Sequence, residues 1–301
     1  MKSVVCPAPA KINLFLAVTG RRADGFHDLV SVVAPVEFGD TLTVEARGEG
    51  REAGGEFSLS CGDAAVPADE SNLVLKAARA FRAATGWRGG AKFILEKRIP
   101  TGAGLGGGSS DAAATLRVLN KMADAPLAPA ALAGIAAQVG SDCALFLHDG
   151  PVVMRGRGER LEALPAGGVG TLRGRRVLIF KPGFGVATAW AYARMVAQPA
   201  TYLSANEAEA RLAVFAVAAA EGGAWENHLL NNMESVAFAK FIALPALLDE
   251  LRARFGLTAR MSGSGSACFA LLADDVPVVE VTAAIRAAWG AEAFVVETRI
   301  A

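Results

Sequence analysis

The stretch Pro100-Thr-Gly-Ala-Gly-Leu-Gly-Gly-Gly-Ser-Ser-Asp-Ala-Ala-Ala114 decides how the rest of the chain is interpreted. It follows a predicted strand at residues 91–97 and leads into a predicted helix that begins at the serines, at residues 109–122. Glycines let backbone amides approach a ligand closely and adopt positive φ angles. The first turn of a helix adds unpaired amide donors and about half a positive charge. The stretch therefore predicts a binding site for phosphate groups.

The glycine-rich loop does not match the common nucleotide-binding motifs. Its G-x-G-x-x-G at Gly102, Gly104 and Gly107 lacks the second strand ending in an acidic residue that a dinucleotide fold requires. No Gly-Lys-Ser/Thr closes the loop, and the motif set of protein kinases is absent. The remaining alternative is a flexible turn without a ligand, which is disfavoured because so many small residues are costly to order. The predicted ATP-binding residues are Pro100, Thr101, Gly102, Ala103, Gly104, Leu105, Gly106, Gly107, Gly108, Ser109 and Ser110.

Composition and charge exclude several classes of protein. The 301 residues carry 30 Lys and Arg against 30 Asp and Glu, so the formal net charge is zero, and 52% of the residues are apolar. This balance excludes a disordered chain and a nucleic-acid binder that relies on positive charge. The four cysteines form no C-x-x-C pair, which disfavours a zinc site. We find no signal peptide, and the apolar run at residues 212–220 is too short to span a bilayer, so we expect a cytoplasmic protein with no membrane partner.

The order of predicted elements indicates an α+β fold with two domains. Strands are predicted at residues 10–19, 30–36, 41–46, 56–60, 91–97, 143–147, 152–155, 176–181, 258–261, 267–272 and 293–299. Helices are predicted at residues 72–85, 109–122, 129–139, 188–195, 207–220, 229–238, 244–255 and 278–289. A turn at Phe38-Gly39-Asp40 would separate the second and third strands. The Gly- and Pro-rich residues 164–174 predict a boundary between domains at 1–165 and 166–301.

Three further segments accompany the glycine-rich loop. They are Ala8-Pro-Ala-Lys-Ile-Asn-Leu14, Gly140-Ser-Asp-Cys-Ala-Leu-Phe146 and Met261-Ser-Gly-Ser-Gly-Ser-Ala-Cys-Phe269. Together they resemble the motif set of the galactokinase, homoserine kinase and mevalonate kinase (GHMP) superfamily. The segment Gly20-Arg-Arg-Ala-Asp-Gly-Phe-His27 makes the chain similar to one branch of it, the 4-diphosphocytidyl-2-C-methyl-D-erythritol kinases. The resemblance runs from residue 8 to residue 269 and implies an N-terminal ATP-binding domain with a mixed or antiparallel sheet and a C-terminal α+β substrate domain.

The resemblance implies ATP-dependent phosphorylation of the 2-hydroxyl of a cytidine-diphosphate-linked methylerythritol, in the non-mevalonate isoprenoid pathway. It makes Lys11 and Asp142 the catalytic pair. The chemistry agrees, because an alcohol is a poor nucleophile near neutral pH and benefits from a positioned base such as Asp142. A lysine beside that base would keep it ionised and offset charge on the attacking oxygen. Taken singly, Lys11 on a strand could be solvated and Asp142 could be a turn residue.

The resemblance also implies which residues meet the substrate. Phe26 and His27 would hold the cytosine, and we favour Tyr192 as the aromatic ring on its other face. Asn13 is expected at the polyol or diphosphate, and Ser264 belongs to a second Gly/Ser loop that could approach the substrate or the ATP phosphates. The alternatives are a surface role for Phe26, a solvated His27 and a tight hairpin at residues 262–266. We expect a small-molecule substrate, no nucleic acid, and a monomer or weak homodimer.

Three positions depart from the family pattern. Phe26 stands in place of the common tyrosine, Ala144 in place of a proline, and Asn232 in place of an aspartate. The sequence offers no carboxylate cage, so we predict no protein metal site and expect Mg²⁺ to arrive with ATP. The alternatives are another kinase of the superfamily, such as homoserine or mevalonate kinase, or a ligand sensor without catalysis on the same fold. A nicotinamide oxidoreductase is a more distant alternative.

Overall fold

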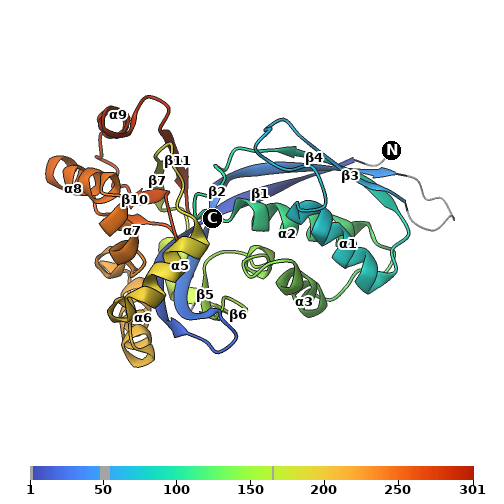
Figure 1. Ribbon diagram of the computed structural model, residues 1–301, viewed down its shortest axis with the longest axis horizontal. Helices are drawn as coiled ribbons and strands as arrows, with labels where there is room; N and C mark the ends of the chain where they lie inside the picture. Colours follow the sequence, from blue (N-terminus) through green and yellow to red (C-terminus); the bar gives the residue numbers. More distant parts are fainter. Residues whose placement is uncertain (1–2, 48–54, 165) are drawn as a thin grey trace. The chain divides into compact units, whose positions relative to one another are not determined.

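The structure, a computed structural model, describes residues 3–47, 55–164 and 166–301. These residues form two compact units, whose elements are labelled in Figure 1. Unit 1 holds the described parts of Met1–Ala10, Phe38–Thr101 and Gly106–Asp149, and unit 2 those of Lys11–Glu37, Gly102–Leu105 and Gly150–Ala301. The long strands β1 (Ser3–Arg21) and β2 (His27–Arg47) contribute residues to both units. Residue 165, at the predicted domain boundary, lies outside the described residues, and that boundary stays a prediction.

Unit 1 places helices on one face of a small sheet (Figure 1). Strand β4 (Gly90–Glu96) pairs in parallel with β3 (Phe57–Cys61) and antiparallel with residues 41–47 of β2. The helices of this unit are α1 (Leu73–Thr85), α2 (Gly107–Met122) and α3 (Pro129–Val139), followed by the 3₁₀ helix η1 (Ala144–Leu147). Helix α1 confirms the prediction from its spacing, because the Asn72 side chain accepts the Val74 amide at 2.9 Å and Gly86 ends the helix at φ 68°.

Unit 2 contains a second sheet in the order β11-β7-β10-β9 within its described residues. The strands that lie wholly in unit 2 are β5 (Val152–Gly156), β6 (Arg160–Ala163), β7 (Arg176–Lys181), β8 (Leu230–Asn231), β9 (Ala259–Met261), β10 (Cys268–Leu271) and β11 (Phe294–Arg299). Its helices are α4 (Ala166–Leu172), α5 (Thr188–Ala197), α6 (Ala205–Ala220), α7 (Glu234–Lys240), α8 (Ala243–Phe255), α9 (Val278–Trp289), and the 3₁₀ helices η2 (Pro199–Thr201) and η3 (Trp225–His228). Strand β5 joins β2 and β6, and β8 runs parallel to β1.

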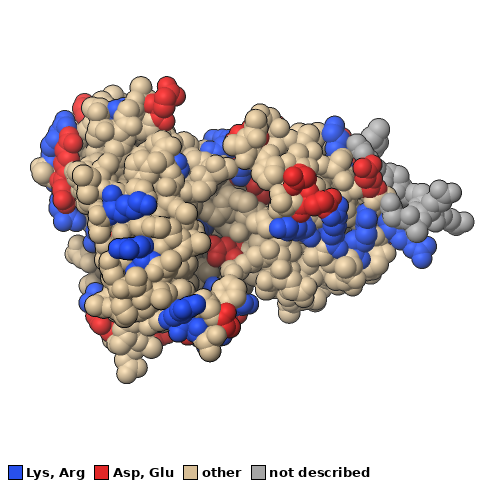
Figure 2. Space-filling view, in the orientation of Figure 1, with Lys and Arg blue, Asp and Glu red and all other residues tan. Residues whose placement is uncertain are grey.

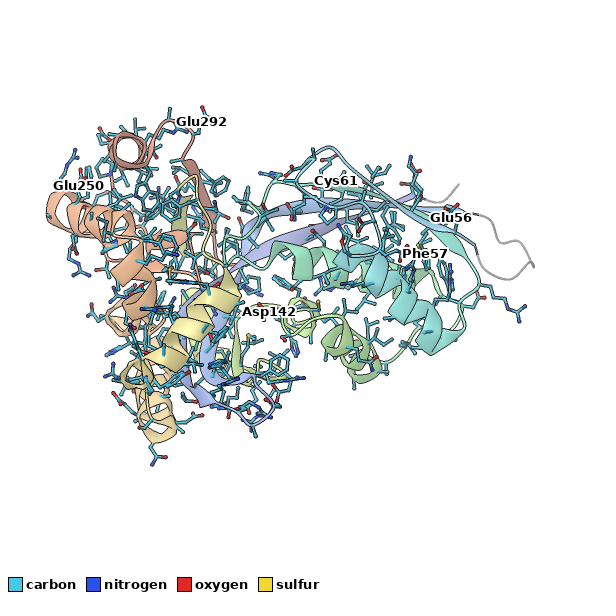
Figure 3. All side chains as sticks on the ribbon, viewed as in Figure 1. Glu56, Phe57, Cys61, Asp142, Glu250 and Glu292 are labelled. Carbon is cyan, nitrogen blue, oxygen red and sulfur yellow. The ribbon has the colours of Figure 1, made fainter. Side chains whose placement is uncertain are left out.

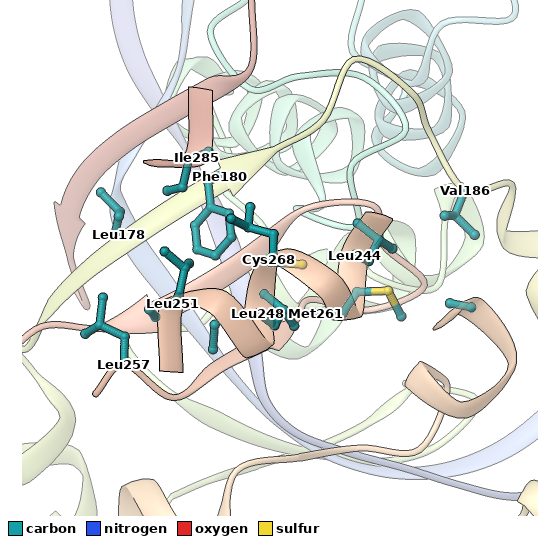
Figure 4. Packing of buried hydrophobic residues seen from close by; sticks show 14 of the residues in the cluster. Leu178, Phe180, Val186, Leu244, Leu248, Leu251, Leu257, Met261, Cys268 and Ile285 are labelled. Carbon is teal, nitrogen blue, oxygen red and sulfur yellow. The ribbon is translucent and has the colours of Figure 1, made fainter. Parts of the chain in front are cut away.

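The core of unit 2 lies between its second sheet and helices α8 and α9. Phe180 of β7 is fully buried against Leu251 of α8 and Ile285 of α9, as Figure 4 shows. Burying a side chain of this size contributes about 1.5–3 kcal/mol each relative to exposure. Mixed sheets with separate helices confirm the predicted α+β class.

The predicted turn at residues 38–40 is wrong, because β2 is one continuous strand. A Cβ atom at Gly39 would overlap the Ala8 carbonyl, so this glycine permits close approach of the neighbouring backbone and forms no turn. Residues 143–147 were expected as a strand and form η1 instead. The Phe146 amide bonds the Cys143 carbonyl at 3.3 Å, which is the three-residue step of a 3₁₀ helix. A short apolar run without alternation does not distinguish the two structures.

Two further predictions of elements differ from the structure. The helix expected at 229–238 begins only at Glu234, because Leu230 and Asn231 pair with β1. The glycine-rich boundary at 164–174 contains helix α4, where a Cβ at Gly167 would lie 3.1 Å from the Ala220 carbonyl oxygen. These glycines therefore allow α4 to pack closely on α6.

Basic and acidic side chains both occur across the face shown in Figure 2, as a net charge of zero would suggest. Among residues 3–47, 55–164 and 166–301, none of the helices combines the length and apolar character that crossing a bilayer requires.

Candidate active site

Lys11 lies on β1 in unit 2, two residues before Asn13 and on the same face of the strand. Its Nζ donates to Asn13 Oδ1 at 2.5 Å, and Asn13 Nδ2 donates to Ser31 Oγ at 3.0 Å. All three side chains are buried. The interpretation of Lys11 as a solvated strand residue is therefore wrong. The ammonium is oriented by an amide that is itself fixed, which is the arrangement that a positioned charge requires.

The middle of the glycine-rich loop packs on the second Gly/Ser loop within unit 2. Ser262 Oγ donates to the Gly104 carbonyl at 3.1 Å, and the Ala267 amide donates to the Ala103 carbonyl at 3.1 Å. Gly104 has φ 77°, and a Cβ there would overlap the Ser262 carbonyl oxygen. Only glycine satisfies both the backbone angle and the space at this position. Residues 262–266 join the antiparallel strands β9 and β10, as the alternative of a tight hairpin predicted, and the approach of this loop to a ligand stays a prediction.

Lys11 is adjacent to both loops in unit 2. Its amide donates to the Leu105 carbonyl at 2.9 Å, and a Cβ on Gly263 would lie 3.3 Å from Lys11 Nζ. Ser264 of the same loop shares a 2.8 Å hydrogen bond with Thr188 at the start of α5. Asn231 anchors the second Gly/Ser loop, because its Nδ2 donates to the carbonyl of Gly263 at 2.8 Å. The structure therefore brings together the predicted residues Lys11, Asn13 and Ser264 with the loop residues 103–105.

The other end of the glycine-rich loop forms the first turn of α2 in unit 1. The helix begins at Gly107 rather than at the predicted serines, and its N-cap Gly106 has φ 75°. A glycine at the N-cap has no side chain that could occupy the first amides of the helix. Within the described residues, the Ser110 hydroxyl is buried and has no hydrogen-bond partner. A buried, unpartnered hydroxyl is costly unless a ligand satisfies it.

Asp142 lies in unit 1 between α3 and η1 and is half-buried (Figure 3). The next residue, Cys143, is fully buried and hydrogen-bonded to Ser109 of the glycine-rich loop. Burial raises the pKa of the Cys143 thiol to about 11, so it packs as a neutral side chain. Asp142 is therefore the direct chain neighbour of Cys143, the residue that contacts Ser109 in the first turn of α2.

The sequence analysis missed a buried ionic triad beside the same turn. Lys97 bridges Asp40 of β2 and Asp111 of α2, with Nζ 2.8 Å from Asp111 Oδ2, and all three side chains are almost inaccessible to solvent. Asp40 Oδ1 also accepts the amides of Arg98 at 2.6 Å and Ile99 at 2.8 Å. The triad thus connects the chain that enters the glycine-rich loop to the helix that leaves it. No motif signals such a triad, since only the fold brings residues 40, 97 and 111 together.

Asp111 makes the free energy of unfolding depend on pH, and this dependence can be measured. Burial, reinforced by Asp40, raises the pKa of Asp111 to about 7, although Lys97 opposes the shift. An aspartate with a raised pKa binds its proton more tightly in the folded state, so its stabilising contribution is full below about pH 4 and is lost as the pH rises through 7. We expect Asp111→Asn to remove this slope, which is at most ~1.4 kcal/mol per pH unit. Urea unfolding of both proteins between pH 4 and 8 measures it, and equal slopes would contradict the prediction.

The predicted base-binding residues lie in unit 2. The His27 ring stacks on Tyr192 with centroids 4.4 Å apart, and its Nε2 lies 3.0 Å from the Tyr202 hydroxyl. The interpretation of His27 as a solvated turn residue is therefore wrong. Burial, assisted by Arg21, lowers the pKa of His27, which keeps the ring neutral near pH 7. Phe26 is 48% exposed, with the Arg157 guanidinium 4.6 Å above its ring.

Lys11 and Asp142 belong to different units, and their pairing stays a prediction, as do the roles of all the residues above. For the metal, the described segments 3–47, 55–164 and 166–301 hold no group of three or more His, Cys, Asp or Glu side chains suited to an ion.

Comparison with known proteins agrees with the motifs. The family described as GHMP kinases N terminal domain matches residues 72–150, and GHMP kinases C terminal matches residues 216–291. A 4-diphosphocytidyl-2-C-methyl-D-erythritol kinase from Gloeobacter violaceus is 36% identical over 99% of this chain and 95% of its own length.

Solved structures show the same relationship. A crystal structure of 4-(cytidine 5'-diphospho)-2C-methyl-D-erythritol kinase is 33% identical, with a TM-score of 0.77 over 99% of this chain and 100% of that one. Homoserine kinase from Cytophaga hutchinsonii is 18% identical, with a TM-score of 0.73 over 100% of this chain and 96% of that one, and therefore shares the fold alone. The chain belongs to the 4-diphosphocytidyl-2-C-methyl-D-erythritol kinase family of the GHMP kinases.

Proposed function

We propose that the chain transfers the γ-phosphoryl group of ATP to the 2-hydroxyl of 4-diphosphocytidyl-2-C-methyl-D-erythritol, a step of non-mevalonate isoprenoid biosynthesis. The observation that carries this proposal is the glycine-rich loop, where Gly102, Gly104 and Gly106 all have positive φ angles and lead directly into the amino end of α2. Such a turn points backbone amides at an anion. The buried Ser110 hydroxyl without a protein partner supports a ligand at the same place.

Asp142 is proposed as the base that accepts the proton of the substrate hydroxyl. An alcohol holds its proton tightly near neutral pH, so its attack requires a carboxylate within hydrogen-bond reach. Cys143, which is tied to Ser109, would hold Asp142 in place beside the loop. Ala144 stands where the family has a proline, so no proline stiffens the turn that carries Asp142. The contact of the buried Cys143 thiol would supply that rigidity instead.

Lys11 is proposed to stabilise the negative charge that develops as the proton leaves. Its ammonium is oriented by Asn13, and its positive charge would offset the charge on the attacking oxygen and the transferred phosphoryl group. What supports the pairing with Asp142 is the motif set, together with the place of each residue beside its own half of one glycine-rich loop. Asn13 would then meet the polyol and Ser264 the diphosphate.

ATP with Mg²⁺ is the proposed phosphoryl donor. The loop residues 100–110 would hold its phosphates through their amides, and the Ser110 hydroxyl is suited to a phosphate oxygen or to the ion. When bound, the ion neutralises charge on the phosphates and orients them. The chain's own contribution is to hold the phosphates at the helix amino end and to keep Lys11 fixed.

The cytosine of the substrate would stack on aromatic rings, one of which is Phe26, so removing the Phe26 ring should weaken substrate binding. We expect Phe26→Ala to raise the KM for the cytidine substrate about tenfold or more, because base stacking contributes ~1–3 kcal/mol. The KM for ATP should stay unchanged. Val214→Ala, which shortens an apolar side chain of similar exposure (51% against 48%) elsewhere in unit 2, is the control and should alter neither constant. An unchanged KM in Phe26→Ala would mean that the base binds elsewhere.

The function itself is tested by ADP release with three acceptors: the cytidine diphosphate substrate, homoserine and mevalonate. We expect turnover with the first alone, because His27, Phe26 and Tyr192 form an aromatic site that the other two acceptors cannot use. Turnover with homoserine or mevalonate alone would overturn the proposed identity of the substrate. Binding of the cytidine compound without ADP release would favour the alternative of a ligand sensor without catalysis.

A further inference from the structure

The chain contains two tyrosines, and both contact His27. Tyr192 of α5 lies flat against the imidazole, with an interplanar angle of 26°. Tyr202 approaches from another direction and places its hydroxyl 3.0 Å from His27 Nε2. His27 is nine-tenths buried and Tyr202 is half-buried, so this hydrogen bond is partly shielded from water. The two rings therefore fix both the plane and the rotation of the imidazole.

The Tyr202 hydroxyl also decides which ring nitrogen carries the proton. The lowered pKa of His27 keeps the ring neutral, so one nitrogen donates and the other accepts. The charged or titratable groups that face the ring are Arg21, Tyr192 and Tyr202, and burial raises the pKa of the Tyr202 phenol, which stays protonated. A phenol is a good donor and an imidazole nitrogen a good acceptor, so Tyr202 donates to Nε2. The proton of the imidazole then resides on Nδ1, the nitrogen that Tyr202 does not contact.

The segment that carries Tyr202 is fixed on both sides to β1. Asn232 Nδ2 donates to the Thr201 carbonyl and to the Val18 carbonyl, at 2.9 Å each, and the Leu203 amide donates to the Val18 carbonyl at 3.2 Å. Asn232 Oδ1 accepts the Val18 amide at 2.8 Å. An aspartate could accept that amide but could not donate twice. The asparagine at this position thus has a structural reason in this chain.

We infer that Tyr202 is a positioning residue for recognition of the base, because its hydroxyl presents His27 Nδ1–H to an acceptor on the ligand. Cytosine offers an acceptor at N3, whereas uracil carries a proton there. The pair therefore favours cytosine over uracil, which stacking on aromatic rings cannot achieve. This inference rests on the proposed function, since it assumes that a cytidine diphosphate is the substrate.

The test compares Tyr202→Phe with Thr201→Val, which removes one hydroxyl from the neighbouring residue, where Thr201 Oγ1 donates to the Gln198 carbonyl at 2.7 Å. The measured quantity is kcat/KM for the cytidine substrate divided by kcat/KM for its uridine counterpart. We expect Tyr202→Phe to lower this ratio about tenfold, as the loss of one well-placed hydrogen bond would, with the KM for ATP unchanged. Thr201→Val should leave the ratio near that of the wild type. Asn232→Asp should lower it in the same direction as Tyr202→Phe.

A second measurement does not depend on turnover. The ¹⁵N chemical shifts of His27 report which nitrogen is protonated, and we expect the wild type to hold the Nδ1–H form and Tyr202→Phe to lose that preference. An unchanged ratio together with unchanged shifts in a folded Tyr202→Phe protein would overturn the inference. If the wild type does not turn over the cytidine substrate, the proposed function fails, while the shifts still decide whether Tyr202 sets the tautomer.

Discussion

Replacing Asp142 with asparagine is expected to lower kcat by about 10²–10⁴-fold, the usual contribution of a general base. The amide has the shape of the carboxylate and cannot accept the proton of the substrate hydroxyl. Substrate binding should change little, so the loss should appear in kcat rather than in KM. Initial rates of ADP release at saturating ATP and cytidine substrate measure both constants.

Asp149→Asn is the matched control, because it makes the same change a few residues further along the chain. The Asp149 side chain is 96% exposed and lies 3.7 Å from the Arg117 guanidinium. Its replacement should leave kcat within a factor of two. An Asp142→Asn protein that turns over at nearly the rate of this control would remove Asp142 from the mechanism.

Replacing Lys97 with methionine is expected to lower the free energy of unfolding by about 3–5 kcal/mol. The substitution leaves Asp40 and Asp111 buried without their cation, and breaking a buried ion pair from one side is costly for that reason. The loss should be smaller at pH 5 than at pH 8, because Asp111 takes up a proton below its pKa of about 7. Urea unfolding at the two pH values measures both effects.

Lys92→Met supplies the comparison for this experiment. Lys92 lies on the preceding strand β4, is about one-third exposed, and sits 3.7 Å from Glu45. A pair of that kind contributes at most about 1 kcal/mol. If Lys97→Met proves as stable as Lys92→Met, the triad contributes no more than a surface pair. A rise in the KM for ATP in Lys97→Met alone would show in addition that the triad positions the glycine-rich loop.

Most helices and strands could be predicted from local patterns, and the failures have physical causes. Helix α1 was predictable because its cap, its apolar spacing and its terminal glycine all agree. Strand β2 was divided in the prediction because Gly39 resembles a turn residue, whereas its role is to admit the Ala8 backbone. Close approach of distant backbones leaves no local signal in a sequence.

The candidate site likewise contains residues that motifs predict and residues whose role only the fold reveals. Lys11, Asn13 and the two glycine-rich loops stand in motifs, and the structure brings them together in unit 2. Tyr202, Asp40 and Lys97 stand in no motif, and the role of Asp111 within the glycine-rich stretch depends on Asp40 and Lys97. Each of these residues acts through a contact that only the tertiary fold creates. A sequence can therefore indicate the groups proposed to meet the substrate more readily than the groups that hold them in place.

The central claim is that Lys11 and Asp142 meet the acceptor hydroxyl beside phosphates held by the glycine-rich loop. A crystal structure with a nonhydrolysable ATP analogue, Mg²⁺ and the cytidine substrate tests it most directly. We expect the phosphates on the amides of residues 102–110, with Lys11 Nζ and a carboxylate oxygen of Asp142 each within hydrogen-bond distance of the 2-hydroxyl. Phosphates bound away from this loop, or a 2-hydroxyl out of reach of both side chains, would contradict the account.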